Sequence, residues 1–259
     1  MLDLLISRLL TGRICLSEAS LASATARLRL NWDYASNRKL WKSKRSKDPN
    51  HKTMADMPLI RGAFRDYTIS AEIVSHFIGN TREAVAKAIK TQTFSHDLIE
   101  ATCMCKYLGT GFSADVLSAL RKLMGARTIQ EESWLSGEDG FMCYATSAAE
   151  GDNTIMELKI VQDIVRGRTS KLPFGLFWRI CGDSRGRTAI FAYLKSFSRA
   201  MLLQKKAMED GALLRDIAWA RAHMRVIDVW LNTEKMPGTE KWMESYGNTI
   251  MNFPTRLQA

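Results

Sequence analysis

The sequence lacks the marks of a membrane-spanning or disulfide-linked protein. None of its apolar runs approaches the roughly 18–20 residues that cross a bilayer. Its cysteines number five, which is odd, and they are widely scattered among mostly apolar neighbours. This usage is typical of reduced thiols rather than of a disulfide scaffold. We therefore expect a cytoplasmic, reducing location or, for a viral protein, the virion.

The motifs of nucleotide-dependent enzymes and metalloproteins are missing as well. There is no G-x-x-x-x-G-K-[ST] phosphate loop and no dinucleotide-binding G-x-G-x-x-G after a strand. Cys103 and Cys105 are separated by one residue, and no second pair completes a tetrahedral zinc set. No zinc-finger, RNP or KH signature is present. The sequence thus predicts a non-enzymatic protein with no catalytic residue, no cofactor and no metal.

One short string resembles a catalytic motif. Gly182 to Gly186 reads G-x-S-x-G, the pattern around the nucleophile of serine hydrolases. A hydrolase sheet needs several strands, but no alternation of apolar and polar residues lasts for a strand's length. His223, the only histidine after Ser184, falls inside a predicted helix. A serine hydrolase using Ser184 therefore ranks below a simpler interpretation, in which Ser184 caps a helix whose N-terminal N–H groups attract an anion.

Helix signals recur along the chain from residue 70 onward. Capping residues predict helices of about 10–14 residues that begin at Ser70, Asn80, Ser95 and Ser113, the last ending at Gly125. A further periodic segment runs from Thr154 to Arg166. We predict an all-α fold with two helical lobes, a basic groove between them and an N-terminal helical arm. The expected parts are an arm with the first helices over 1–36, a basic exposed loop over 37–58, an N-terminal lobe over 59–150 and a C-terminal lobe over 151–259.

The N-terminal arm has an amphipathic pattern. Its apolar residues suit burial against the same molecule, a neighbouring copy or a membrane. We assign them to oligomerisation: Leu2, Leu5, Ile6, Leu9 and Leu10.

Positive charge is in excess and unevenly distributed. The chain has 37 Lys plus Arg against 27 Asp plus Glu, for a formal net charge of +10. The net charge is +7 over 1–68, −4 over 69–156, +8 over 157–225 and −1 over 226–259. Two basic blocks around an acidic one suggest the two walls of a single groove, although they could also fold onto unrelated faces.

The candidate contacts to nucleic acid come from these basic blocks. In the first block, Trp41 lies within a dense basic run and could stack on an unpaired base. Arg221 and Arg225 are left out, because Asp228 is placed to form a local ion pair with Arg225 on a helix face opposite Trp219. The candidates are Arg38, Lys39, Trp41, Lys42, Lys44, Arg45, Lys47, Arg166, Arg168, Lys171, Arg185, Arg187, Lys195 and Arg199.

Taken together, these features predict a structural protein that binds nucleic acid without sequence specificity. The concrete form of the prediction is a viral nucleoprotein, nucleocapsid-like, that coats single-stranded RNA as a head-to-tail homo-oligomer in the ribonucleoprotein of a virion. The alternative is a peripheral, matrix-like protein that meets a membrane surface through its N-terminal helix. The choice between RNA and DNA stays open.

Overall fold

We analysed a computed structural model of the whole chain, which describes residues 2–40, 52–128, 145–168, 208–232 and 245–246. Regular structure in these ranges is helical with no strand, which confirms the predicted all-α class. The elements are α1 (Leu2–Asn37), η1 (Met54–Asp56), α2 (Pro58–Thr91), α3 (His96–Met124), η2 (Gly125–Thr128), α5 (Asn153–Val165) and α9 (Gly211–Asn232).

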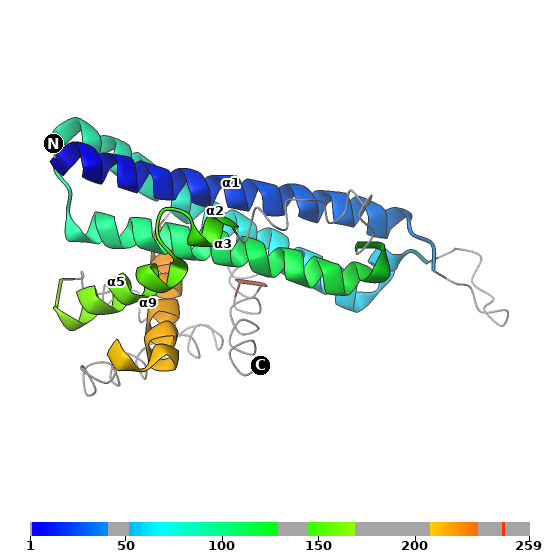
Figure 1. Cartoon of the computed structure of the whole chain (residues 1–259). Helices are drawn as coiled ribbons and strands as arrows, with labels where there is room; N and C mark the ends of the chain where they lie inside the picture. The colour runs from blue at the N-terminus through cyan, green and yellow to red at the C-terminus, as the bar shows by residue number, and fades with distance from the viewer. Residues whose placement is uncertain (1, 41–51, 129–144, 169–207, 233–244, 247–259) are drawn as a thin grey trace.

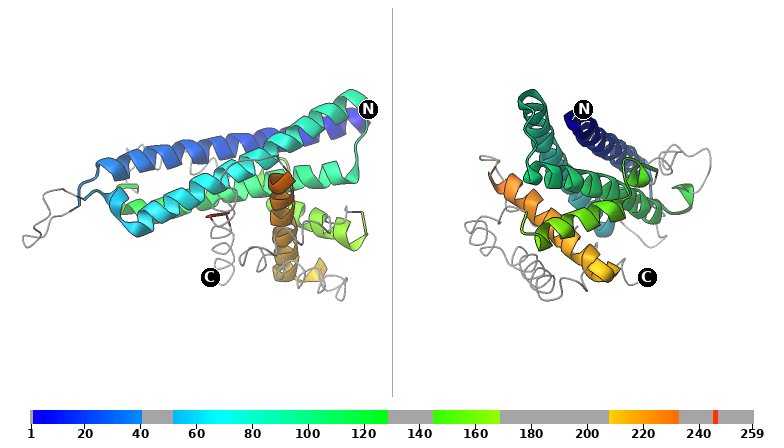
Figure 2. Two further views of the ribbon diagram at one scale, coloured as in Figure 1. Left: turned by 180° about the vertical axis from the view of Figure 1, so that it is seen from behind. Right: turned by 60° about the vertical axis from the view of Figure 1, so that its left-hand side comes forward.

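The three longest helices, α1, α2 and α3, lie side by side and form an elongated bundle (Figure 1). α1 and α2 run in opposite directions along it. α9 crosses the bundle steeply, and α5 packs against both α3 and α9 (Figure 2). One continuous hydrophobic core joins α1, α2, α3, α5 and α9.

α2 is much longer than the sequence suggests. Separate helices were expected to begin at Ser70 and Asn80, with Gly79 between them, but α2 runs unbroken from Pro58 to Thr91, so both predicted starts are wrong. The buried stripe continues across the glycine through Ile78 and Val85, and the packing of that stripe outweighs the roughly 1 kcal/mol that a helical glycine costs. Thr81 follows the predicted cap at Asn80, but its hydroxyl donates to the Phe77 carbonyl at 2.9 Å within the helix.

α3 has one predicted start and one that is wrong. Ser95 caps its N-terminus as expected, accepting a hydrogen bond from the Leu98 N–H at 3.2 Å, and α3 ends at Gly125. No new helix begins at Ser113, whose hydroxyl donates to the Gly109 carbonyl at 2.6 Å. Gly109 lets α1 approach closely, since a Cβ there would lie 2.9 Å from the Cβ of Ser17.

The N-terminal segment forms a full member of the bundle. Leu10 is 1% exposed in the core, and Ile6 packs against the same core, so the chain itself covers these two. Leu5 and Leu9 are 59% and 40% exposed. Leu2 is the first residue of α1. The segment from Thr154 to Arg166 is helical as predicted: it forms α5, capped by Asp152, whose side chain accepts from the Thr154 N–H at 2.7 Å.

Candidate functional site

The basic residues predicted to contact nucleic acid fall largely outside the described residues. Arg38 and Lys39 are exposed at the end of α1, where Lys39 forms an isolated bridge with Thr53. Arg166 and Arg168 are exposed after α5. The end of α1 and α5 lie toward opposite ends of the bundle, so the structure does not bring these two described groups together (Figures 1 and 2). Outside the described residues are Trp41, Lys42, Lys44, Arg45, Lys47, Lys171, Ser184, Arg185, Arg187, Lys195 and Arg199.

A pocket of about 680 Å³ opens between α1 and α2. Its volume falls in the range of small-molecule binding sites. α1 contributes four residues at helical spacing, and α2 contributes one face over several turns. The lining consists of Thr25, Leu28, Arg29, Trp32, Arg61, Phe64, Arg65, Thr68, Ile69, Ala71, Glu72 and Ser75.

The floor of the pocket is apolar. Leu28, Phe64 and Ala71 are each at most 4% exposed, so they belong to the core as well as to the pocket. Trp32 lies over this floor with 36% of its surface exposed. Its ring is 5.3 Å from that of Phe64 at 58°, a tilted aromatic pair that fixes the indole at the rim. An apolar chain can therefore be buried along this floor.

Three exposed arginines lie over the same pocket: Arg29, Arg61 and Arg65. Two of them form surface ion pairs, Arg61 Nη2 with Asp56 at 3.0 Å and Arg65 Nε with Asp66 at 3.1 Å. Exposed pairs of this kind contribute about 0–1 kcal/mol, and a guanidinium has five N–H donors. A ligand anion can therefore bind these arginines at little cost to the existing pairs.

Asp56 does not depend on Arg61 to stay ionised. Hydrogen bonds from the backbone N–H and the hydroxyl of Thr53, at 2.8 and 3.0 Å, are the main causes that lower the pKa of Asp56, and Arg61 adds a smaller effect. The carboxylate is thus held by its own turn. Arg61 is consequently available to a second anion without leaving Asp56 unsupported.

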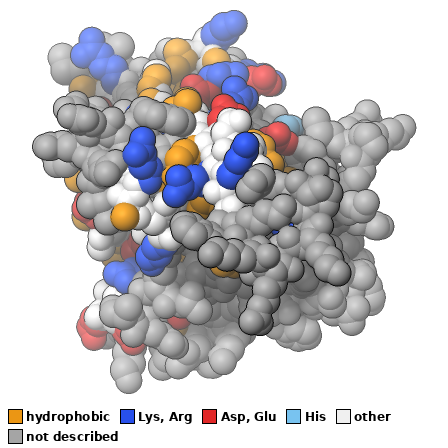
Figure 3. Space-filling view, turned by 90° about the vertical axis from the view of Figure 1, so that its right-hand side faces the viewer, with side chains coloured by type: hydrophobic (Ala, Val, Ile, Leu, Met, Phe, Trp, Pro, Cys, Tyr) orange, Lys and Arg blue, Asp and Glu red, His pale blue; other side chains and the backbone are white. Residues whose placement is uncertain are grey.

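The end of the bundle where α1 stops and α2 starts is both basic and apolar. Figure 3 faces this end and shows Lys and Arg side chains gathered around hydrophobic ones. The exposed large hydrophobic residues of these segments are Trp32, Met57 and Leu59, at 36%, 41% and 71%. An amphipathic anion meets complementary chemistry on this surface.

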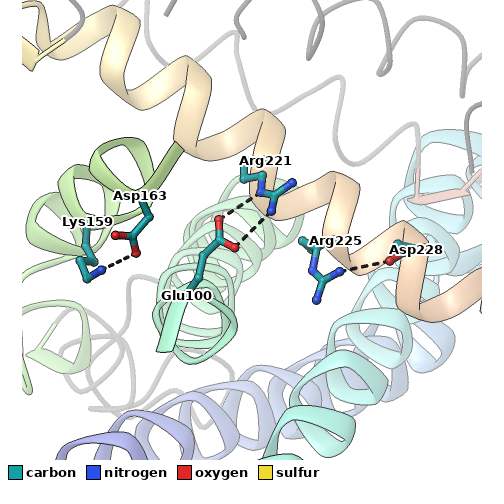
Figure 4. A network of polar contacts seen from close by, with 6 residues as sticks. All are labelled: Glu100, Lys159, Asp163, Arg221, Arg225 and Asp228. Atoms are coloured by element: carbon teal, nitrogen blue, oxygen red, sulfur yellow. Dashed lines mark hydrogen bonds and ion pairs between the residues drawn. The ribbon is translucent and has the colours of Figure 1, made fainter. Parts of the chain in front are cut away.

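A second polar feature is buried between α3 and α9. Arg221 donates through Nε and Nη2 to the two carboxylate oxygens of Glu100 at 3.0 and 3.2 Å, and the side chains are 1% and 2% exposed (Figure 4). Arg221, expected on the helix face opposite Trp219, is thus buried in the core and paired with Glu100. The predicted pair of Arg225 and Asp228 is confirmed at 3.3 Å.

Other buried titratable groups are also held in structural contacts. The Lys106 ammonium donates to the carbonyls of Ser147, at 2.7 Å, and of Gly151, and burial lowers its pKa to about 8. Burial lowers the pKa of His223 to about 3, and its Nδ1 lies 2.7 Å from the Tyr246 hydroxyl. Burial likewise raises the pKa of Cys105 to about 12. The contacts of Lys106 and His223 join segments that lie apart in the sequence.

The described part of the chain has neither a candidate metal site nor a helix that could cross a membrane. None of its groups of His, Cys, Asp or Glu could hold a metal ion. None of its helices combines the length and apolar character needed to cross a membrane.

Sequence analysis missed the pocket because it placed the start of the helix at Ser70. The pocket residues between Arg61 and Glu72 follow a helical spacing on α2. The sequence analysis expected a loop over 37–58 and a helix that began only at Ser70, so it did not identify this helix face. Arg29 and Trp32 carry the same spacing on α1. A search for amphipathic faces upstream of residue 70 could have found the α2 face, whereas its pairing with α1 depends on tertiary contacts.

Comparison with known proteins shows a likeness in structure only. No family model matches the sequence, and neither does any curated protein. Acyl-CoA oxidase1 of Yarrowia lipolytica superposes with a TM-score of 0.71 at 12% identity, over 92% of this chain and 42% of that chain. A tomato acyl-CoA oxidase gives 0.69 at 15% identity, over 91% and 42%. Acyl-CoA oxidase3 of Yarrowia lipolytica gives 0.68 at 12% identity, over 93% and 42%.

These comparisons overturn the prediction of function. The solved structures that this chain resembles are enzymes, so the prediction of a nucleocapsid-like viral nucleoprotein that coats single-stranded RNA in a virion is wrong. None of the three oxidases is a matrix protein or a hydrolase, the alternatives considered from the sequence. The chain spans less than half the length of these enzymes. Across its described residues, the protein has the fold of a helical region of acyl-CoA oxidases.

Proposed function

We propose that this chain is a non-catalytic helical domain that binds an amphipathic anion in the pocket between α1 and α2. The ligand is an acyl chain joined to a phosphate- or carboxylate-bearing head group, as in an acyl-CoA. One observation carries the proposal: a single pocket of about 680 Å³ combines a buried apolar floor with three exposed arginines. Leu28 and Phe64 suit the chain, and Arg65 is one of the cations that suit the head group.

The energetics fit a ligand that has both parts. Each buried methylene contributes about 0.8 kcal/mol, so eight of them contribute about 6 kcal/mol. One charge-assisted hydrogen bond from each of the three arginines to a phosphate or carboxylate contributes about 1.5–3 kcal/mol, or about 4.5–9 kcal/mol for the three together. Association costs at least about 4 kcal/mol, which leaves a dissociation constant near the micromolar range only when chain and head group act together.

The structural likeness supports the choice of ligand. The similar solved structures are acyl-CoA oxidases, and an acyl-CoA has an apolar chain and an anionic head. We limit the proposal to binding because the described lining consists of guanidinium groups, hydroxyls and a carboxylate over an apolar floor. Guanidinium groups suit an anionic head group, and an apolar floor suits an acyl chain.

Isothermal titration of the full chain with lauroyl-CoA tests the proposal. We expect saturable binding near the micromolar range, and at least tenfold weaker binding of CoA alone and of the neutral amphiphile dodecyl maltoside. Arg65→Ala and Arg29→Ala should each weaken lauroyl-CoA binding by about tenfold. The matched control is Arg121→Ala, which removes an exposed arginine from the last turn of α3, outside the pocket.

Two results would overturn this function. One is the absence of saturable lauroyl-CoA binding to the wild-type chain. The other is an equal loss of affinity in the Arg65 and Arg121 variants, since that would show attraction to net positive charge rather than to the pocket.

A further inference from the structure

We infer that the pocket has a fixed polarity, with the anionic head at the arginine end and the far end of the acyl chain beside Glu72. Glu72 then makes the site selective for amphiphiles with a single head group over α,ω-dicarboxylates. This inference rests on the proposed function and adds the class of ligand and the residue that determines it.

The charges in the lining are separated along α2. Arg61 and Arg65 occupy one end of the pocket face, and Glu72 comes eleven residues after Arg61. At 1.5 Å of rise per residue, the two lie about 16 Å apart along the helix axis. On α1, Arg29 is one turn from Trp32, whose ring packs on Phe64 near the arginine end. Because α1 and α2 run in opposite directions, Arg29 lies between the turns of Trp32 and Thr25, and Arg61 and Arg65 precede Glu72 along the groove.

Among the described lining residues, those nearest to Glu72 are not basic. Its neighbours there are Thr25 and Ser75, which are neutral. The next cation along α2 is Arg82, and its guanidinium donates to Glu18 of α1 at 2.8 Å. A carboxylate arriving at this end would meet the exposed Glu72 carboxylate without a lining cation to balance it. Like charges at close range disfavour both ionised forms.

The distance along α2 from Arg61 to Glu72 matches the length of a common acyl chain. An extended chain advances about 1.25 Å per bond, as follows from a C–C bond of ~1.52 Å at tetrahedral angles. A fourteen-carbon chain is therefore about 16 Å long, close to the separation of Arg61 and Glu72 along α2. With its head on the arginines, its last carbon lies near Glu72. A second carboxylate on that carbon would lie beside Glu72.

The test compares tetradecanoate with tetradecanedioate by isothermal titration of the full chain at pH 8. We expect the wild-type chain to bind tetradecanoate at least about tenfold more tightly, because the dicarboxylate places a like charge beside Glu72 and desolvates it. Glu72→Gln should raise the affinity for tetradecanedioate by about three- to tenfold relative to the affinity for tetradecanoate. Glu83→Gln is the matched control, since Glu83 is an exposed glutamate of α2 outside the pocket.

The outcomes separate the two proposals. If tetradecanoate and lauroyl-CoA both fail to bind the wild-type chain, the proposed function and this inference are both wrong. If both ligands bind and Glu72→Gln changes the affinity ratio of the two acids no more than Glu83→Gln does, the proposed function stands and the polarity is wrong. Circular dichroism of each variant shows whether it keeps its helical fold.

Discussion

Removal of Glu100 should strongly destabilise the protein. Glu100 and Arg221 form a bidentate ion pair with 2% and 1% exposure, joining α3 to α9. Glu100→Ala leaves the guanidinium buried without its carboxylate, and breaking one partner of such a pair costs about 3–5 kcal/mol of the free energy of unfolding. For a denaturant slope of about 2 kcal/mol/M, the urea midpoint should fall by about 2 M.

A double variant distinguishes this ion pair from ordinary packing. Glu100→Leu combined with Arg221→Met removes both charges and keeps apolar volume, so it should be more stable than either single variant and close to the wild type. Arg82→Ala is the surface control: its pair with Glu18 has side chains 58% and 37% exposed, so the loss should stay below about 1 kcal/mol. Urea unfolding followed by circular dichroism measures the wild type and each of these variants. The reasoning is refuted if Glu100→Ala costs no more than Arg82→Ala.

Three further predictions concern the core. Gly109→Ala should destabilise the protein by about 1–3 kcal/mol, because the new Cβ would lie 2.9 Å from the Cβ of Ser17. Gly79→Ala is the control: its Cβ would meet open space, so this variant should be neutral or stabilising. The urea midpoints of the two variants are compared with that of the wild type. Lys106→Met should raise amide hydrogen exchange over 145–153, since the carbonyls of Ser147 and Gly151 lose their donor. Unchanged exchange would contradict that role. Burial lowers the pKa of His223 to about 3, so below about pH 6.5 the unfolded chain binds more protons than the folded one. The contribution of His223 to the free energy of unfolding should therefore fall as the pH drops, by about 2–3 kcal/mol at pH 4.5. Urea unfolding at each pH should show that His223→Phe lacks this contribution, and an identical pH dependence in the variant and the wild type would refute it.

The amphipathic periodicity of the sequence was enough to predict helices, but not their lengths. Ser95 and Gly125 marked real helix ends because cap chemistry and backbone conformation act locally. Gly79 and Ser113 carry similar local signals, yet the core packing of α2 and α3 overrides them.

The candidate site depends on contacts that the sequence does not display. Arg61 and Arg65 become part of a site only because Leu28 and Trp32 of α1 lie opposite them. Glu100 and Arg221 are separated by 121 positions, so no short-range pattern connects them. The uneven distribution of basic residues was a real property of the sequence, but charge along a chain does not fix which residues meet in space.

The most direct test of the central claim is the affinity of the full chain for lauroyl-CoA, measured by isothermal titration in the wild type and in the Arg65→Ala and Arg121→Ala variants. The pocket between α1 and α2 predicts saturable wild-type binding near the micromolar range, about tenfold weaker binding in the Arg65 variant and unchanged binding in the Arg121 variant. No saturable binding, or equal weakening in both variants, would contradict it.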